Sequence, residues 1–156
     1  MQKINAFPHH YVTQIDANGV LSAGSRVSIA GGIPQQFGGS DKVWGPEDLL
    51  VGAAGLCLLT TFQSLAQKEP LSVSGYHCSA DGTLEKTASG LGFTSIRLTV
   101  ELTVAAAEEE QARLLMQRAK KYCIVANALN CPVELVLSVQ PSETESATGP
   151  RSALVR

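Results

Sequence analysis

The sequence has little net charge and no cluster of basic residues. Its 156 residues carry 12 Lys and Arg against 14 Asp and Glu, which gives a net charge of −2. Because proteins that follow phosphate backbones need a basic face, we expect no nucleic-acid partner. The longest apolar run, from Leu49 to Leu59, is shorter than the ~20 residues that cross a bilayer. The sequence therefore also predicts no membrane partner.

Signals for secretion and for metal binding are scarce as well. The N-terminal segment MQKINAFPHHYV has neither an apolar core nor a small-residue cleavage site, so we expect no signal peptide and a cytoplasmic location. In that compartment four cysteines are reactive or buried rather than a disulfide framework. Adjacent His77 and Cys78 would point to opposite faces of a strand, and no second Cys or His pair has ligand spacing. We expect no metal and no cofactor.

What the sequence does contain is a succession of short strands and two helices. Residues 9–37 hold β-branched segments separated by turns, with Asn18-Gly19 as a tight-turn dipeptide. Helices are predicted over residues 45–67 and 105–123. Strands are predicted over residues 71–80, 92–104 and 132–140, with residues 81–92 connecting the first two. The order βββ-α-ββ-α-β indicates an α+β fold in a single domain, residues 1–140. The polar tail, residues 141–156, is predicted to be mobile.

The clearest patterns lie in the second half of the chain. The strand at residues 92–104 alternates apolar and polar residues, which predicts one buried and one exposed face. Its apolar residues are Ile96, Leu98, Val100, Leu102 and Val104. The helix at residues 105–123 is amphipathic. Its apolar face is formed by Ala112, Leu115, Ala119 and Tyr122.

The first helix, in contrast, has no polar face. Pro46 fits the first helical position, and Glu47 and Asp48 place negative charge at the positive end of the helix dipole. From Leu49 to Phe62 almost every residue is apolar or small, so this helix must be buried on most sides. One small sheet cannot cover it. A dimer in which two sheets wrap a shared pair of helices would do so.

Two of the four cysteines stand in segments with a recognisable pattern. Cys78 and Cys131 are interpreted as small buried residues. Cys57 lies in the string PEDLLVGAAGLCL, and Cys123 lies in AKKYCIVANAL, followed by the strand PVELVLSV. With the loop GIPQQFGGSDKVWGPEDLL ahead of the first, these segments resemble the OsmC/Ohr family of hydroperoxide reductases over residues 10–140.

The resemblance implies an intertwined homodimer in which antiparallel sheets surround two central helices, with the active sites at the interface. It implies that Cys57 is the peroxidatic cysteine, which becomes a sulfenic acid, and that Cys123 is the resolving cysteine, which closes a disulfide with it. A thiol reductant, a lipoylated protein in some members, would restore both thiols. Glu47 matches a carboxylate that holds a catalytic arginine beside the first cysteine.

That arginine is missing from the positions where the family carries it. The first hairpin reads DANG, and the loop before the first helix has Gln35-Gln36. Arg26 is the only arginine before that helix, and it is either the replacement, turned inward beside Cys57, or a solvated strand residue. The start of the helix is about three turns from Cys57, too distant to lower its pKa. Ile124 also stands where the family usually has Pro.

Two functions therefore remain open. The first is a thiol-dependent peroxidase that reduces small organic hydroperoxides, or hydrogen peroxide, through a disulfide between Cys57 and Cys123. The second is a non-peroxidase relative that binds a thiol or another small molecule and has lost the activating arginine. An unperturbed thiol, with a pKa of about 8.5, is mostly protonated at neutral pH. The pKa of Cys57 therefore separates the two functions.

Overall fold

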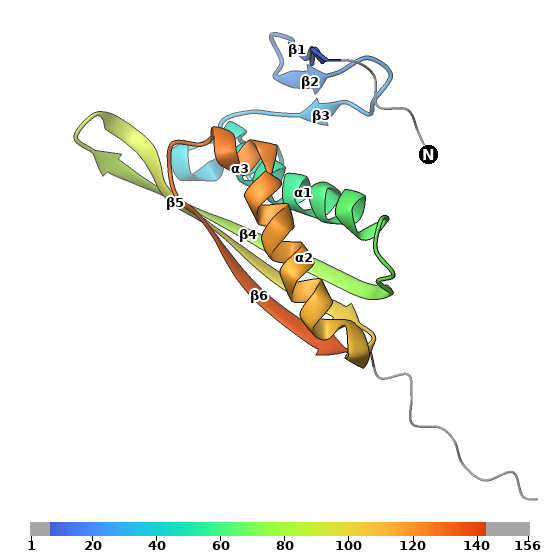
Figure 1. Ribbon diagram of the computed structural model, residues 1–156. Coiled ribbons are helices and arrows are strands. Elements are labelled where there is room, and N and C mark those ends of the chain that lie inside the picture. Colours follow the sequence, from blue (N-terminus) through green and yellow to red (C-terminus); the bar gives the residue numbers. More distant parts are fainter. Residues whose placement is uncertain (1–6, 143–156) are drawn as a thin grey trace, which may run out of the picture. The chain divides into compact units, whose positions relative to one another are not determined.

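The structure is a computed structural model that describes residues 7–142, and it has the mixed α+β architecture that the sequence predicts (Figure 1). The chain forms two compact units, one ending at Leu50 and the other beginning at Val51. The elements follow in the order β1 (Gln14–Ile15), β2 (Val20–Ser22), β3 (Ile29–Ala30), α1 (Pro46–Ala66), β4 (Val73–Thr87), β5 (Gly90–Val104), α2 (Glu109–Tyr122), α3 (Ile124–Ala128) and β6 (Val133–Pro141). The single domain over residues 1–140 stays a prediction, and residues 143–156 of the predicted mobile tail lie outside the described residues.

A short antiparallel sheet in the order β1-β2-β3 characterises the first unit. Asp16 holds the turn between β1 and β2. Its carbonyl accepts the Gly19 N–H at 3.0 Å, and its Oδ1 accepts the N–H groups of Asn18 and Val20, both at 2.9 Å. Gly19 has a φ of 78°, which glycine adopts without steric cost. The predicted turn at Asn18-Gly19 is therefore confirmed.

Helix α1 begins where the sequence places it. Pro46 is its first residue and has no N–H to leave unpaired. The Gly45 N–H donates to Asp48 Oδ2 at 3.0 Å, so a side chain of the first turn closes the start of the helix. The helix ends at Ala66. The prediction of residues 45–67 is thus confirmed to within one residue at each end.

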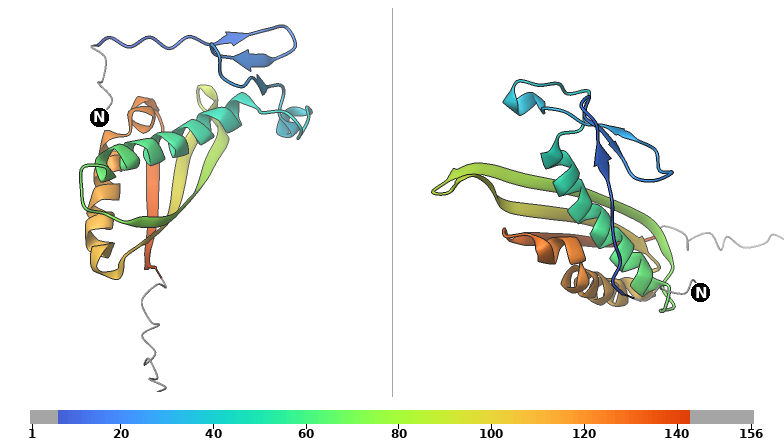
Figure 2. Two further views of the ribbon diagram at one scale, coloured as in Figure 1. Left: turned by 90° about the vertical axis from the view of Figure 1, so that its right-hand side faces the viewer. Right: turned by 90° about the horizontal axis from the view of Figure 1, so that it is seen from above.

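The second sheet has the order β4-β5-β6 and is covered on one face by α1 and α2 (Figure 1, Figure 2). Antiparallel pairing of β4 with β5 continues to Thr87 and Gly90, so the predicted connection over residues 81–92 is wrong. β6 runs parallel to β5, so the expectation of antiparallel sheets also needs correction. The reason is that α2 and α3 return the chain to the level where β5 begins, and parallel strands need such a crossover.

The core of the second unit lies between this sheet and the two helices. The five apolar residues predicted for the inner face of β5 are each no more than 1% exposed, which confirms the predicted alternation. Burial of such side chains is the main favourable contribution to folding. The helices add further fully buried residues, which are Ala54, Leu58 and Phe62 from α1 and Ala112, Leu115, Met116 and Ala119 from α2.

One residue of the predicted apolar face of α2 is not in the core. The Tyr122 side chain is 55% exposed, with Lys121 Nζ 5.9 Å from its ring centroid. The prediction for Tyr122 is wrong because α2 ends there. Cys123 leaves the helical conformation, with φ −66° and ψ 106°, and its own side chain is 0% exposed.

The outer side of α1 is apolar and is not covered by the rest of the second unit. Leu56 is 62% exposed, and a Cβ added to Gly52 would meet no atom within 4 Å. With 21 residues, α1 is longer than the apolar run considered above, and by length and composition alone it could cross a membrane. Core helices of soluble proteins pass the same test. Because its inner side is part of the core, we interpret α1 as a core helix with one face left open.

Candidate functional site

Cys57 and Cys123 come together where α1 faces the bend between α2 and α3. The bend exists because Cys123 adopts an extended conformation between the two helices. It carries the Cys123 side chain to α1, where its Sγ lies 3.9 Å from the Ala54 carbonyl oxygen. Ala54 is one helical turn before Cys57. The sequence prediction that these two cysteines share a site is therefore consistent with the local geometry, and both thiols are free in this structure.

Cys57 is half-buried, and its neighbours shift the pKa of its thiol. Burial is the largest single effect and raises the pKa of this thiol. Four hydrogen-bonding groups lower the pKa, and their combined effect exceeds that of burial, so the net pKa lies below the ordinary value. In decreasing order of effect, these donors are the Val125 N–H, the Cys123 thiol, the Thr61 hydroxyl and the Ile124 N–H. Cys57 Sγ and Thr61 Oγ1 are 4.0 Å apart. Cys57 is therefore the thiol of this site that most readily becomes a thiolate.

Cys123 has the opposite character. It is fully buried, and burial is the largest of the effects that raise the pKa of its thiol. The Ala126 N–H acts in the other direction, and Lys120 does so more weakly. The hydrogen bond to Cys57 and the charge on Cys57 raise the pKa again. The net result is a raised pKa. Cys123 thus stays protonated and donates while Cys57 is charged.

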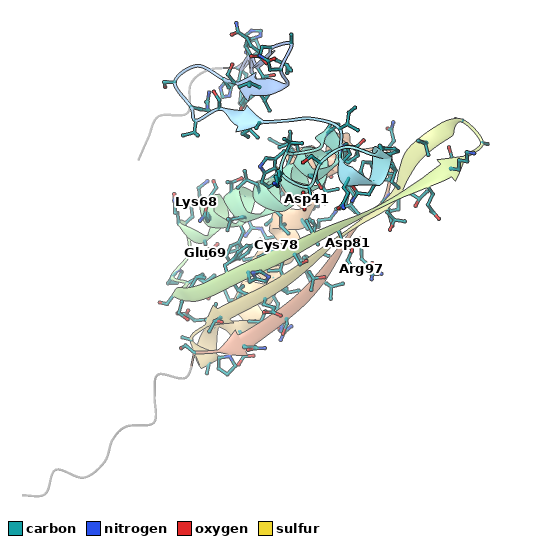
Figure 3. The ribbon with its side chains drawn as sticks, turned by 180° about the vertical axis from the view of Figure 1, so that it is seen from behind. Asp41, Lys68, Glu69, Cys78, Asp81 and Arg97 are labelled. Carbon is teal, nitrogen blue, oxygen red and sulfur yellow. The ribbon has the colours of Figure 1, made fainter. Side chains whose placement is uncertain are left out.

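Cys78 and Cys131 pack against the core but are only half-buried, so they are less enclosed than the sequence predicts. Burial raises the pKa of Cys78, although the Tyr76 hydroxyl partly offsets this. Cys78 faces the helices from β4, and its Sγ would lie 3.6 Å from a Cβ added to Gly55. Figure 3 shows Cys78 on this strand, together with Asp81 and with Arg97 of β5.

Arg26 and Glu47, the predicted guanidinium–carboxylate pair, are not joined in this structure. Arg26 is exposed, and its Nη1 donates to the Ala23 carbonyl at 3.2 Å. Glu47 Oε2 is buried and has no hydrogen-bond partner among residues 7–142. Both belong to the first unit, whereas Cys57 belongs to the second. A role for either residue at Cys57 stays a prediction. A buried carboxylate oxygen with no donor is what a guanidinium partner would satisfy.

No group of three or more His, Cys, Asp or Glu side chains that could hold a metal ion occurs in the part of the chain that the structure describes. The two thiols of the site differ in character. A half-buried thiol of lowered pKa stands beside a buried thiol of raised pKa, and the first can attack an electrophile that the second cannot reach.

Sequence reasoning missed three of the donors at Cys57. Thr61 could be found from its spacing, since it lies four residues after Cys57 and residues at i and i+4 share one face of a helix. The sequence indicates the N–H groups of Ile124 and Val125 less directly. In the sequence Ile124 differs from the family only in not being Pro, and any residue other than Pro supplies an N–H.

Comparison with known proteins places these features in one family. The family model described as "OsmC-like protein" matches residues 39–138. Among curated proteins, the uncharacterised protein YmaD of Bacillus subtilis is 24% identical over 123 residues, which cover 76% of this chain and 81% of YmaD.

Solved structures show the same fold. An organic hydroperoxide resistance protein OsmC from Legionella pneumophila has a TM-score of 0.66 at 17% identity, covering 86% of this chain and 98% of that protein. An OsmC-like protein of unknown function from Vibrio cholerae has a TM-score of 0.67 at 20% identity, covering 78% of this chain and 82% of that protein. At these identities the likeness concerns the fold.

Proposed function

This chain belongs to the OsmC-like protein family, and on that premise we propose that it is a thiol-dependent peroxidase that uses Cys57 and Cys123. The observation that carries the proposal is the contrast between these thiols. Cys57 has a lowered pKa and partial exposure, and Cys123 has a raised pKa and full burial. A peroxidatic cysteine needs to be ionised and accessible, whereas a resolving cysteine needs only to reach it.

The proposed reaction has three steps. The Cys57 thiolate attacks one oxygen of the peroxide, the O–O bond breaks, and the other oxygen leaves as an alcohol after taking a proton. Cys57 is then a sulfenic acid. Cys123 attacks this sulfur, and water leaves as the disulfide closes. A dithiol reductant, a lipoylated protein being one candidate, finally gives up two thiol hydrogens to restore both cysteines and becomes a disulfide itself.

We propose small organic hydroperoxides as the substrates. Ile124 and Val125, whose backbone groups lower the pKa of Cys57, both have apolar side chains, and Ile124 is 78% exposed. An alkyl group would find apolar surface there, which hydrogen peroxide does not need. The proposal includes a cytoplasmic location and a homodimer, for which the uncovered face of α1 around Leu56 is the support.

A non-peroxidase thiol-binding protein is the second candidate. The observation that favours it is that the groups of the second unit that act on Cys57 carry no full positive charge. A thiolate without a cation can bind an electrophile and still be slow with peroxide.

Peroxide consumption by the purified protein separates the two candidates. With cumene hydroperoxide and dihydrolipoamide, the wild-type protein should turn over continuously. Cys57→Ser should abolish consumption, because no nucleophile remains. Without dihydrolipoamide, Cys123→Ser should consume one equivalent per chain and stop at the sulfenic acid, which dimedone labels. A wild-type protein that consumes no peroxide, while Cys57 still alkylates rapidly at neutral pH, would favour the second candidate.

A further inference from the structure

We propose that a groove beside α2 binds a small organic anion, a carboxylate carried on an apolar chain or ring. The groove has a volume of about 640 Å³ and lies between α2 and the turn that joins α1 to β4. This volume is typical of small-molecule sites. Every residue that lines the groove belongs to the second unit, and neither Cys57 nor Cys123 is among them. The inference therefore goes beyond the proposed function and does not rest on it.

One wall of the groove is the exposed side of α2. Gln111, Leu114, Arg118 and Lys121 follow one another at intervals of three and four residues, so they share one face of the helix over about 15 Å. Leu114 and Leu115 supply the apolar part of the lining. Leu115 is 3% exposed, whereas Leu114 is 54% exposed. An apolar group in the groove would remove the Leu114 side chain from water, which is favourable.

The opposite wall is the turn after α1, which contains Glu69 (Figure 3). Hydrogen bonds hold this turn in place. The Glu69 N–H donates to the Ala66 carbonyl at 3.1 Å, and the Leu71 N–H donates to the Glu69 carbonyl at 2.8 Å. The Ser72 N–H donates to Oε2 of Glu108, the residue before α2, at 2.7 Å. The turn is thus tied to the start of α2, and a groove that is formed in advance costs less ordering when a ligand binds.

The charged side chains of the groove favour an anion. Arg118 Nη1 is 3.8 Å from Glu69 Oε1, and both side chains are exposed, so this ion pair contributes little. It also leaves most of the guanidinium N–H donors free for a carboxylate. Lys121 forms no ion pair in the part of the chain that the structure describes; its Nζ lies 5.9 Å from the Tyr122 ring centroid. Two cations and one carboxylate therefore line a groove whose apolar part is Leu114 and Leu115.

The measurement is a titration of the nitrogen-15-labelled full-length protein with decanoate, kept below its critical micelle concentration and followed by backbone amide chemical shifts. Decanoate should shift the amides of residues 69–72 and 111–121, and the shifts should reach saturation. Acetate has the charge without the chain, so it should not saturate at the same concentrations. Decanol has the chain without the charge and serves as the neutral reference.

Two exposed side chains of the groove, Lys121 and Glu69, give changes of opposite sign. Lys121→Gln should weaken decanoate binding about two- to fivefold, the contribution of one exposed ion pair, and leave decanol binding unchanged. Glu69→Gln should strengthen decanoate binding by a similar factor, because it removes a negative charge and releases Arg118. Lys120→Gln is the matched control, since it removes the same charge from the neighbouring position. Lys120 does not line the groove, so this variant should bind decanoate as the wild-type protein does.

Leu114→Ser tests the apolar part and should weaken decanoate and decanol alike, by about fivefold. The inference would be overturned if decanoate produced no saturable shift at residues 69–72 and 111–121. Equal effects of Lys121→Gln and Lys120→Gln on decanoate, or equal effects of Lys121→Gln on decanoate and decanol, would also overturn it. Acetate binding as tight as that of decanoate would do the same. No outcome depends on peroxide consumption, so a failure of the proposed function would leave this inference standing.

Discussion

Cys123 has two separable roles in the proposed site, and a pair of substitutions can separate them. As a thiol, Cys123 donates a hydrogen bond to Cys57. Once Cys57 has been oxidised to the sulfenic acid, Cys123 acts as the resolving nucleophile. Cys123→Ser removes the second role but keeps an O–H donor. Cys123→Ala removes both. Neither variant can form a disulfide with Cys57, so any difference between them in the first step reports the donor.

The size of that difference follows from the strength of the lost bond. A hydrogen bond to a charged group contributes about 1.5–3 kcal/mol, which corresponds to about one to two pKa units. Well below the pKa, the thiolate fraction falls about tenfold for each unit. The thiolate itself becomes more nucleophilic as its pKa rises. With a Brønsted coefficient of about 0.4–0.5, its rate constant increases about threefold for each pKa unit, which offsets part of the tenfold loss. The net rate in Cys123→Ala should therefore be about three- to tenfold lower than in Cys123→Ser.

The assay is the second-order rate of reaction with dithiodipyridine from acid to mildly basic pH. Cys78→Ser and Cys131→Ser are present in both proteins, so that Cys57 is the only cysteine that reacts. Cys123→Ala should be the slower protein at low pH. Above both pKa values, where the two proteins are equally ionised, it should be about three- to tenfold faster, because a thiolate of higher pKa is the stronger nucleophile. Superimposable profiles for the Ser and Ala variants would refute the donor role of Cys123. A constant ratio at every pH would point to access rather than ionisation.

Two further predictions concern the helix that carries Cys57. Leu56→Asp places a charge on the exposed apolar side of α1, so light scattering should show a monomer if a second chain covers that side. Val136→Asp, on the outer face of the sheet, should leave the mass unchanged; a dimeric Leu56→Asp protein would contradict this use of α1. Gly82→Ala should lower the free energy of unfolding in urea by about 1–3 kcal/mol, because its Cβ would lie 2.5 Å from Val51 Cγ2. Gly55→Ala, with ordinary contacts of 3.5 Å or more, should instead stabilise by up to about 1 kcal/mol; equal effects of the two changes would contradict the packing argument.

The elements with strong local patterns could be predicted from the sequence. The start of α1 follows from Pro46 and the acidic residues after it, and the buried face of β5 follows from strict alternation. The hairpin between β4 and β5 could not be predicted in its full length. Residues 81–87 contain Gly, Asp and Lys, which are poor in strands. They are held by pairing with residues 90–97, and such pairing depends on register rather than on composition.

The candidate site divides in the same way. Cys57 and Cys123 could be selected from their sequence contexts, because both stand in recognisable segments. The donors around Cys57 could not, because two of them are backbone groups that any residue except Pro provides. Their position depends on the bend at Cys123, and the sequence predicts an uninterrupted helix to that residue. A bend of one residue, fixed by tertiary packing, decides whether the sulfur meets N–H groups or apolar side chains.

The two pKa shifts in the site are linked, and the linkage gives the proposed reaction an order. The charge on Cys57 and the hydrogen bond to it raise the pKa of Cys123, while the Ala126 N–H and Lys120 lower it. When Cys57 becomes a neutral sulfenic acid, the contribution of its charge disappears and the two that lower the pKa remain. Cys123 then ionises more easily, at the moment when a second nucleophile is required. Cys57→Ser imitates that loss of charge with a neutral hydroxyl, so the alkylation profile of Cys123 should shift to lower pH in this variant. A profile that stays at the wild-type position would show that the two thiols ionise independently, and the order of steps would then need another cause.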